Sequence, residues 1–340
     1  MIDPYNAVLA VTQNCNSHCI MCDVWKRKRE EKEMIPSDYS ALPSSLRDIN
    51  ISGGEPFLKD ELPEVIEVVK RTCPKARILI STNGLLIEKM RRSAPLLLRI
   101  DREVAIRVSI DGIGKTHDRI RGIPGSFNKA VEGIRILKDA GIRDLGIAMT
   151  VMEGNVSEIE KVYNLAEDRG VEFSISIVSD SSSLFGDRKK LLRPKKPELF
   201  LNLMYLINRE YRNINPKRWF RAWFEKGLLR YALTRKRPLP CDAVEGFFYM
   251  DSFGEIYCCP VLPYSLGNLR RISWNALWNS DESRRVRGLL KGCNRCWMIC
   301  TARSQTRSNL LKVGTEVLLD KFKAHLNILK FNHHEDINGE

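Results

Sequence analysis

The sequence lacks the patterns that would carry a chain into or across a membrane. No apolar run reaches the 18 or so residues of a transmembrane helix, and the first residues do not show the charged-then-apolar pattern of a secretory signal. Histidine is scarce, with five in 340 residues. His325, His333 and His334 sit near the end of the chain and are expected to be ordinary surface residues. These absences favour a cytoplasmic location, and no residue is assigned as a catalytic acid or base.

Cysteine is plentiful by contrast, and three of the ten cysteines follow an apolar run at 7–11. Cys15, Cys19 and Cys22 have the spacing C-x3-C-x2-C. Three thiolates in one short loop can hold three irons of a [4Fe–4S] cluster, which ferredoxins bind with four. The fourth iron would stay open for chemistry. A zinc site is the alternative, but zinc needs a fourth ligand, and His18 lies too close to Cys19 in sequence to share the ion well.

Five further motifs follow in order: 53–56 (GGEP), 81–84 (STNG), 108–112 (VSIDG), 117–122 (HDRIRG) and 125–127 (GSF). Glycines at a strand end let the backbone approach a ligand closely. In this order behind the three cysteines, the motifs resemble those of the radical S-adenosylmethionine (SAM) superfamily.

The resemblance implies a set of cofactor-binding residues: Cys15, Cys19, Cys22, Gly54, Glu55, Asn83, Ser109 and Arg121. Glu55 would pair with the ammonium of methionine, and Ser109 and Arg121 would hold the ribose and carboxylate region. Thr150 is a weaker candidate. The family usually has an aromatic residue before the third cysteine, whereas this chain has Met21, which can still pack against adenine as a soft contact.

The resemblance also implies a reaction class. SAM would chelate the open iron, and one electron from the reduced cluster would cleave its C–S bond. The resulting 5′-deoxyadenosyl radical would take a hydrogen atom from an unreactive C–H bond, while the protein places the reactants and excludes side reactions. A flavodoxin or ferredoxin would supply the electron.

The coarse pattern of the chain predicts an α/β fold. Apolar, β-branched runs recur at 7–11, 48–52, 77–81, 104–110, 145–151 and 171–178, and helix-like stretches such as 62–71 and 127–140 lie between them. Strands that alternate with helices indicate parallel βαβ units. Six such repeats fit a partial (β/α)6 barrel, with ligand chemistry at the C-terminal strand ends.

A second group of cysteines lies beyond a proline-marked boundary at 237–240: Cys241, Cys258, Cys259, Cys293, Cys296 and Cys300. With Gly254-x4-Cys259 and C-x2-C-x3-C at the end, the region resembles the SPASM/twitch extension of radical SAM enzymes. Two fully ligated clusters would need about eight thiolates. One auxiliary [4Fe–4S] cluster is therefore expected, held by Cys241, Cys259, Cys293 and Cys296.

Two of these cysteines have no assigned role. Cys258 is unassigned, and Cys300 could replace one ligand or help a second, incompletely ligated cluster. A structural zinc site is the alternative for this region. Cys73 stands alone and is expected to be a plain thiol.

The net charge of +13 is concentrated in one stretch. Residues 188–237 carry 16 basic residues and three acids. Within it, 217–231 predicts a helix with an aromatic face and cations opposite, a pattern typical of membrane interfaces. The tail repeats this pattern less strongly, with a stripe formed by Leu311, Leu318, Phe322, Leu326 and Leu329.

The expected domains are a radical SAM core at 1–215, a basic aromatic linker helix at 216–240, an auxiliary-cluster domain at 241–300 and an amphipathic helical tail at 301–340. Three functions remain open. The favoured substrate is a lipid or lipid-linked molecule at the membrane surface, reached through 217–231, with the chain peripheral to the membrane. A ribosomal peptide or protein is the second. A metal-stabilised nucleic-acid-binding protein without enzymatic activity is the third.

Overall fold

The computed structural model describes residues 3–27, 31–178 and 193–329. Residues 188–192 of the basic stretch and 330–340 of the predicted tail, with His333 and His334, lie outside the described residues.

Six parallel strands form the first part of one sheet: β1 (Asn6–Thr12), β2 (Asp48–Gly53), β3 (Arg77–Thr82), β4 (Ala105–Ser109), β5 (Asp144–Val151) and β6 (Glu172–Ile177). They pair in sequence order from β1 to β6. All seven residues of β1 are buried, as expected for a parallel strand covered on both faces. The predicted runs are thus confirmed as strands.

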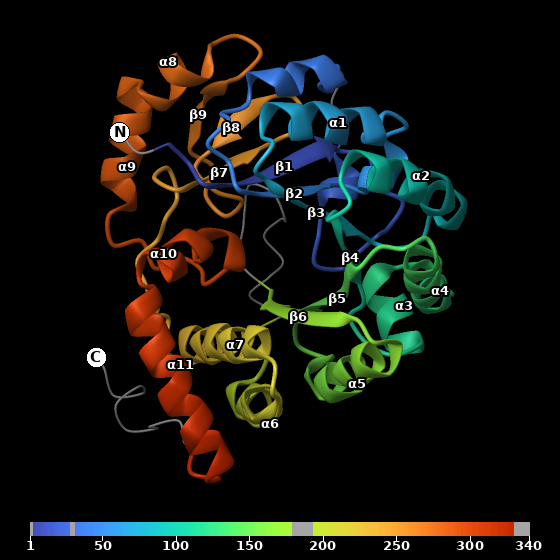
Figure 1. Cartoon of the computed structure of the whole chain (residues 1–340), viewed down its shortest axis with the longest axis vertical. Helices are drawn as coiled ribbons and strands as arrows, with labels where there is room; N and C mark the ends of the chain where they lie inside the picture. The colour runs from blue at the N-terminus through green and yellow to red at the C-terminus, as the bar shows by residue number, and fades with distance from the viewer. Residues whose placement is uncertain (1–2, 28–30, 179–192, 330–340) are drawn as a thin grey trace.

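Helices alternate with these strands and cover the outside of the sheet (Figure 1). They are α1 (Leu62–Thr72), α2 (Ile87–Ile100), α3 (Lys115–Arg121), α4 (Ser126–Asp139) and α5 (Ile159–Arg169), with 3-10 turns at Val24–Lys26, Pro36–Ala41, Pro56–Leu58 and Val156–Glu158. In α1, the apolar residues fall on one face, which is buried against the sheet. The arrangement confirms the partial (β/α)6 barrel.

The cysteine-rich region extends the barrel sheet, a pairing that the sequence analysis did not predict. Strand β7 (Phe247–Met250) pairs in parallel with β1, and β8 (Glu255–Tyr257) and β9 (Ser265–Asn268) continue the sheet antiparallel. The remaining elements of this region are α8 (Trp274–Trp278), α9 (Asp281–Leu290) and a 3-10 turn at Ile299–Thr301. The auxiliary region is therefore bound to the barrel through backbone hydrogen bonds.

Three long helices lie together below the sheet edge in Figure 1: α6 (Lys196–Arg212), α7 (Pro216–Thr234) and α11 (Leu310–His325), with the short α10 (Arg303–Ser308) leading into the last. Helix α7 packs against β6 and α6, and α11 packs against both α6 and α7. Among the described residues, no helix is long and apolar enough to cross a membrane.

Candidate active site

The three N-terminal cysteines share a pocket of about 290 Å³ at the C-terminal ends of the barrel strands. Cys15, Cys19 and Cys22 occupy the loop after β1, where the spacing in sequence brings their side chains to one wall. The opposite walls come from the ends of β2 to β6. The residues expected there from the sequence are all present except Glu55: Gly54, Asn83, Ser109, Arg121 and Thr150. The topology thus assembles residues that are up to 135 positions apart in the chain.

The two glycines after β2 let the chain pass close to the cysteine loop. A Cβ atom added to Gly54 would lie 2.1 Å from the carbonyl oxygen of Asn14, and one on Gly53 would lie 2.3 Å from that of Thr12. Gly53 also has φ +129°, in the region that side chains disfavour. Both glycines line the pocket, and the lack of side chains lets the β2 loop pack directly on the backbone of the loop that carries the cysteines.

Glu55 lies behind this wall and does not line the pocket. Its side chain is 1% exposed. It accepts hydrogen bonds from the Phe57 amide at 3.2 Å, the Thr82 hydroxyl at 2.7 Å and the Asn83 amide at 2.7 Å. Burial raises the pKa of this carboxyl to about 6. These three donors occupy three of the roughly four acceptor sites of a carboxylate and hold the β2 and β3 loops together. The expected pairing of Glu55 with the methionine ammonium stays a prediction.

Arg121 links the cysteine loop to the barrel. Its guanidinium contacts the Asp111 carboxylate at 2.7 Å (Nη2–Oδ2) and donates to the Cys19 Sγ at 3.7 Å. Asp111 is fully buried and also accepts from the Thr150 amide at 2.8 Å. The nearby Asp111 carboxylate and Cys19 raise the pKa of Arg121, against the effect of its burial. A fixed positive charge therefore faces the pocket beside one thiol.

Asn83 and Met21, two further residues of the pocket wall, are held by contacts with their neighbours. The Asn83 side chain donates to Asn16 Oδ1 at 2.8 Å and accepts from the Leu85 amide at 3.0 Å. Met21 lines the pocket and packs beside an apolar cluster of Ile120, Met152 and Val178. Met21 and this cluster form an apolar surface of the kind on which an adenine ring packs.

Some pocket residues carried no signal in the sequence. Trp25 lines the pocket from the cysteine loop, and Met298 reaches it from the auxiliary region. Asp111, within the VSIDG motif, is buried behind the pocket wall, where it contacts Arg121, and the sequence analysis did not predict it as a site residue. His117, in the next motif, is fully buried and accepts from the Asp111 amide at 3.1 Å. Burial lowers the pKa of His117 to about 3, so its imidazole is neutral at pH 7.

The protein alone does not bring these thiols together as ligands of one ion. Within the described residues, no three His, Cys, Asp or Glu side chains converge closely enough to hold a single metal ion. A four-iron cluster takes one thiolate on each iron, so its ligands stand further apart. Burial raises the pKa of Cys15 to about 12. Cluster binding must therefore displace a proton from this thiol.

A second cavity, of about 280 Å³, adjoins the first. The two share Ser52, Gly53 and Met298 among their walls. Aromatic and apolar side chains dominate the second cavity: Tyr249, Phe253, Tyr257, Phe224, Trp297, Leu262 and Ile299. Among its described lining residues, Arg27 and Asp251 are the charged ones. A substrate held here would lie next to the pocket of the three cysteines.

The four cysteines expected to hold an auxiliary cluster gather on the far side of this cavity. Cys241 and Cys293 share a thiol hydrogen bond, which lowers the pKa of Cys293 to about 6 and raises that of Cys241. Burial raises the pKa of Cys296 to about 11, and Cys296 interacts electrostatically with both Cys259 and Cys293. Cys259 lines the cavity wall.

The two unassigned cysteines differ in position. Cys258 is fully buried, with its Sγ 3.8 Å from the Cys259 Sγ and 3.8 Å from the Leu262 carbonyl oxygen. Cys300 lines the cavity beside Cys259 and interacts electrostatically with Cys259 and Cys296. Five thiols therefore lie near one another in this region, and two of them, Cys259 and Cys300, line the cavity. Arg237, which the sequence analysis did not single out, contacts the Cys296 Sγ at 3.7 Å.

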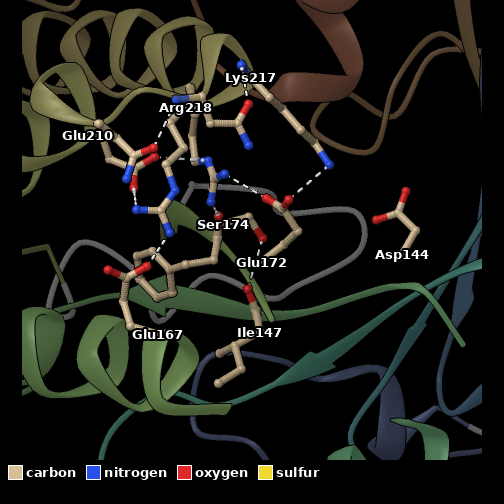
Figure 2. A network of polar contacts seen from close by, with 12 residues as sticks. Asp144, Ile147, Glu167, Glu172, Ser174, Glu210, Lys217 and Arg218 are labelled. Carbon is tan, nitrogen blue, oxygen red and sulfur yellow. Dashed lines mark hydrogen bonds and ion pairs between the residues drawn. The ribbon is translucent and has the colours of Figure 1, made fainter. Parts of the chain in front are cut away.

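The predicted membrane-facing helix is enclosed by the protein. Figure 2 shows Arg218 between Glu210 and Glu167, and Lys217 reaching Glu172. Arg221 joins the same network, with Nε 3.1 Å from Glu210 and Nη2 2.6 Å from Glu172.

The aromatic side of α7 is covered as well. Trp223 is buried and donates to Glu316 at 2.7 Å, and Phe224 stacks on Trp297 with ring centroids 5.5 Å apart. The interpretation of 217–231 as a membrane-binding face is therefore corrected. Of the acids that neutralise its cations, Glu172 on β6 and Glu167 on α5 lie 45 and 51 positions away from their partners, whereas Glu210 on α6 is close to them in sequence.

Comparison with known proteins agrees with the motifs. The model of the radical SAM superfamily matches residues 9–166, and the model of the SPASM iron–sulfur cluster-binding domain matches 241–297. Together they cover more than half of the chain.

Relatives that match most of this chain have named functions. The antilisterial bacteriocin subtilosin biosynthesis protein AlbA of Bacillus subtilis is 27% identical over 82% of this chain and 60% of its own length. An AdoMet-dependent heme synthase of Methanosarcina barkeri is 26% identical over 82% of this chain and 83% of its own length. The chain thus spans less than two thirds of the first protein.

A solved structure shares the fold. The enzyme anSMEcpe with bound AdoMet superposes with a TM-score of 0.62 and 15% identity, over 92% of this chain and 99% of that one.

Proposed function

This chain belongs to the radical SAM superfamily and carries a SPASM iron–sulfur domain, and we propose that it removes a hydrogen atom from a peptide or protein substrate. Membership of the family implies a [4Fe–4S] cluster, SAM and an auxiliary iron–sulfur cluster as cofactors. When bound, the first cluster and SAM supply a 5′-deoxyadenosyl radical. Electrons come from flavodoxin or ferredoxin in this family generally. The chain is therefore an enzyme, and a nucleic-acid-binding protein without activity is excluded.

The residues around the first pocket have distinct roles in this proposal. The Cys15, Cys19 and Cys22 thiolates would hold the cluster, and Gly53 and Gly54 would let the β2 loop lie close enough to the cysteine loop to form the wall beside SAM. Arg121 would hold the carboxylate of SAM, since it is the buried cation in that wall. Asn83, Ser109 and Thr150 would donate or accept hydrogen bonds to the ribose. Glu55 acts behind the wall by fixing the two loops.

In the auxiliary region, Cys241, Cys259, Cys293 and Cys296 would hold the second cluster. This set includes the hydrogen-bonded pair, Cys241 and Cys293. It also includes Cys296, which interacts electrostatically with Cys259 and Cys293. Cys300 would stay at the cavity wall, and Cys258 behind Cys259. A cluster in this position could exchange an electron with a substrate radical in the neighbouring cavity.

The choice of a peptide as the substrate rests on the second cavity. A volume of about 280 Å³ is at the lower limit for a drug-sized ligand. Its aromatic and apolar walls suit one or two side chains of a peptide, while the rest of the peptide stays outside. AlbA, named for bacteriocin biosynthesis, is consistent with this class.

A tetrapyrrole is the second candidate, because the heme synthase matches more of its own length than AlbA does. A propionate-bearing macrocycle would need more space and more than the single arginine of the described cavity wall. The hypothesis of a lipid substrate rested on 217–231 as a membrane-facing helix. Because that helix packs on the rest of the protein, it no longer supports a lipid substrate.

The test uses the reconstituted enzyme with dithionite and SAM. Two probes are compared: a pool of cysteine-containing synthetic peptides with deuterated side chains, and an iron porphyrin with deuterated propionates. We expect deuterium to appear in 5′-deoxyadenosine with the peptides only. Transfer from the porphyrin alone would assign the second candidate and overturn the first.

A further inference from the structure

Helix α11 is apolar on two opposite faces, of which the described residues cover only one. Val313, Val317 and Ala324 are buried where α11 packs on α6 and α7. On the other side, Leu311 is 91% exposed and Phe322 is 65% exposed. Leu318 and Leu326 are also exposed. The spacings of seven, four and four residues between these four positions place them in one stripe along the helix.

We call Leu311, Leu318, Phe322 and Leu326 the α11 stripe. Three of the seven exposed large apolar residues between 310 and 328 lie outside it: Leu310, Leu319 and Ile328. Contiguous exposed apolar surface of this kind is uncommon on a soluble monomer and marks an interaction site. Its position differs from that of 217–231, whose aromatic residues are buried or half-buried against the core.

The charges of α11 indicate which partner fits the stripe. Both acids of the helix point away from it into the protein: Asp320 contacts Lys226 at 2.8 Å and is 4% exposed, and Glu316 accepts from Trp223 at 2.7 Å. Lys312 and Lys323 are exposed, and on a helical projection they border one edge of the stripe. Lys321 borders the other edge, but its ammonium donates to the carbonyl oxygens of Tyr211 and Asn213 at 3.0 Å each, so Lys312 and Lys323 give the stripe one cationic edge.

An apolar stripe with exposed lysines along one edge suits one class of partner best. A second copy of the chain would bring Lys312 and Lys323 against equivalent lysines, with no acid at hand to neutralise them. An anionic lipid surface accepts the apolar side chains at the boundary of headgroups and acyl chains and attracts the lysines. Helix α11 has 16 residues, too few to span a bilayer, so it would lie in the plane of the interface.

We propose that α11 docks this protein onto membrane surfaces that contain anionic lipid, with the α11 stripe as the inserted face. The docking surface is independent of the substrate. It would place the enzyme at the membrane whether its substrate is a peptide or a tetrapyrrole.

The test is cosedimentation of the full reconstituted chain with vesicles. Vesicles of phosphatidylcholine mixed with phosphatidylglycerol are compared with vesicles of phosphatidylcholine alone. We expect binding to the mixed vesicles that high salt weakens. The double variant Leu318→Gln/Phe322→Gln should bind at least about tenfold less, and Lys312→Glu/Lys323→Glu about tenfold less.

A matched control removes two exposed apolar residues elsewhere. Ile272→Gln/Leu289→Gln changes side chains of the auxiliary region that are 44% and 52% exposed, and it should bind like the unchanged protein. Circular dichroism and 5′-deoxyadenosine release check that each variant folds. Absence of binding to mixed vesicles, or equal loss in the control, would overturn the proposal. A dimer in sedimentation velocity that Leu318→Gln/Phe322→Gln dissolves, without vesicle binding, would assign the stripe to a second copy.

Discussion

The carboxylate of Asp111 holds the guanidinium of Arg121 at 2.7 Å, and both side chains are buried. Breaking a buried ion pair from one side leaves the other charge without a partner, which costs about 3–5 kcal/mol. Replacing Asp111 by Asn keeps the size of the side chain and removes its charge. We expect Asp111→Asn to lower the free energy of unfolding by about 3 kcal/mol and to weaken SAM binding.

Urea unfolding and SAM titration of the reconstituted protein measure the two effects. The control is Asp60→Asn, since Asp60 pairs with Lys89 at an exposed site and should leave both values unchanged. Equal unfolding midpoints for Asp111→Asn and the unchanged protein would show that Arg121 does not depend on this carboxylate.

Glu55 should make the stability of the cluster-free protein depend on pH. Its pKa in the folded state, about 6, exceeds the ordinary value of 4.5, so the folded state binds the proton more tightly. The stabilisation is complete below pH 4.5 and is lost as the pH rises through 6. It amounts to about 2 kcal/mol. The variant Glu55→Gln, which cannot ionise, should lack this loss.

The measurement is the difference in urea unfolding free energy between the two proteins from pH 4.5 to 7. Subtracting the two proteins' values removes the pH dependence that other buried acids contribute equally to both. Asp242 is one such acid, because burial also raises its pKa to about 6. A difference that stays constant over this range would contradict the placement of Glu55.

Gly54 should tolerate no side chain. A Cβ atom there would overlap the backbone of Asn14, which cannot move aside as a side chain can. We expect Gly54→Ala to destabilise the fold by about 3 kcal/mol and to reduce iron incorporation per chain. Gly288→Ala is the matched control, because that glycine faces open space within α9; it should stabilise by about 0.5 kcal/mol. Full iron loading of Gly54→Ala would refute the need for this close approach.

Arg221 should stabilise the fold rather than bind a membrane. Its removal leaves Glu210, which is fully buried, and Glu172 without their shared cation. Arg221→Ala should lower the free energy of unfolding by about 3 kcal/mol, whereas the exposed Arg285→Ala should not change it measurably. Urea unfolding and vesicle cosedimentation are measured together. Unchanged stability with reduced vesicle binding would restore the original interpretation of 217–231.

The sequence predicted what depends on neighbours along the chain. The cysteine spacing, the glycines after β2 and the strand–helix alternation are local patterns, and each was found where expected. Three features depend on distant partners: the acids around α7, the contacts of Glu55 with Thr82 and Asn83, and the pairing of β7 with β1. An aromatic, basic helix has the same pattern whether protein or lipid covers it, so the pattern of 217–231 could not distinguish the two.

The account rests on SAM cleavage at the first cysteine loop. The direct measurement is 5′-deoxyadenosine release after anaerobic reconstitution with iron and sulfide, dithionite and SAM. We predict release by the unchanged protein and none above background by Cys15→Ala/Cys19→Ala/Cys22→Ala, with the auxiliary cysteines still binding iron. Undiminished release by that triple variant would contradict the account.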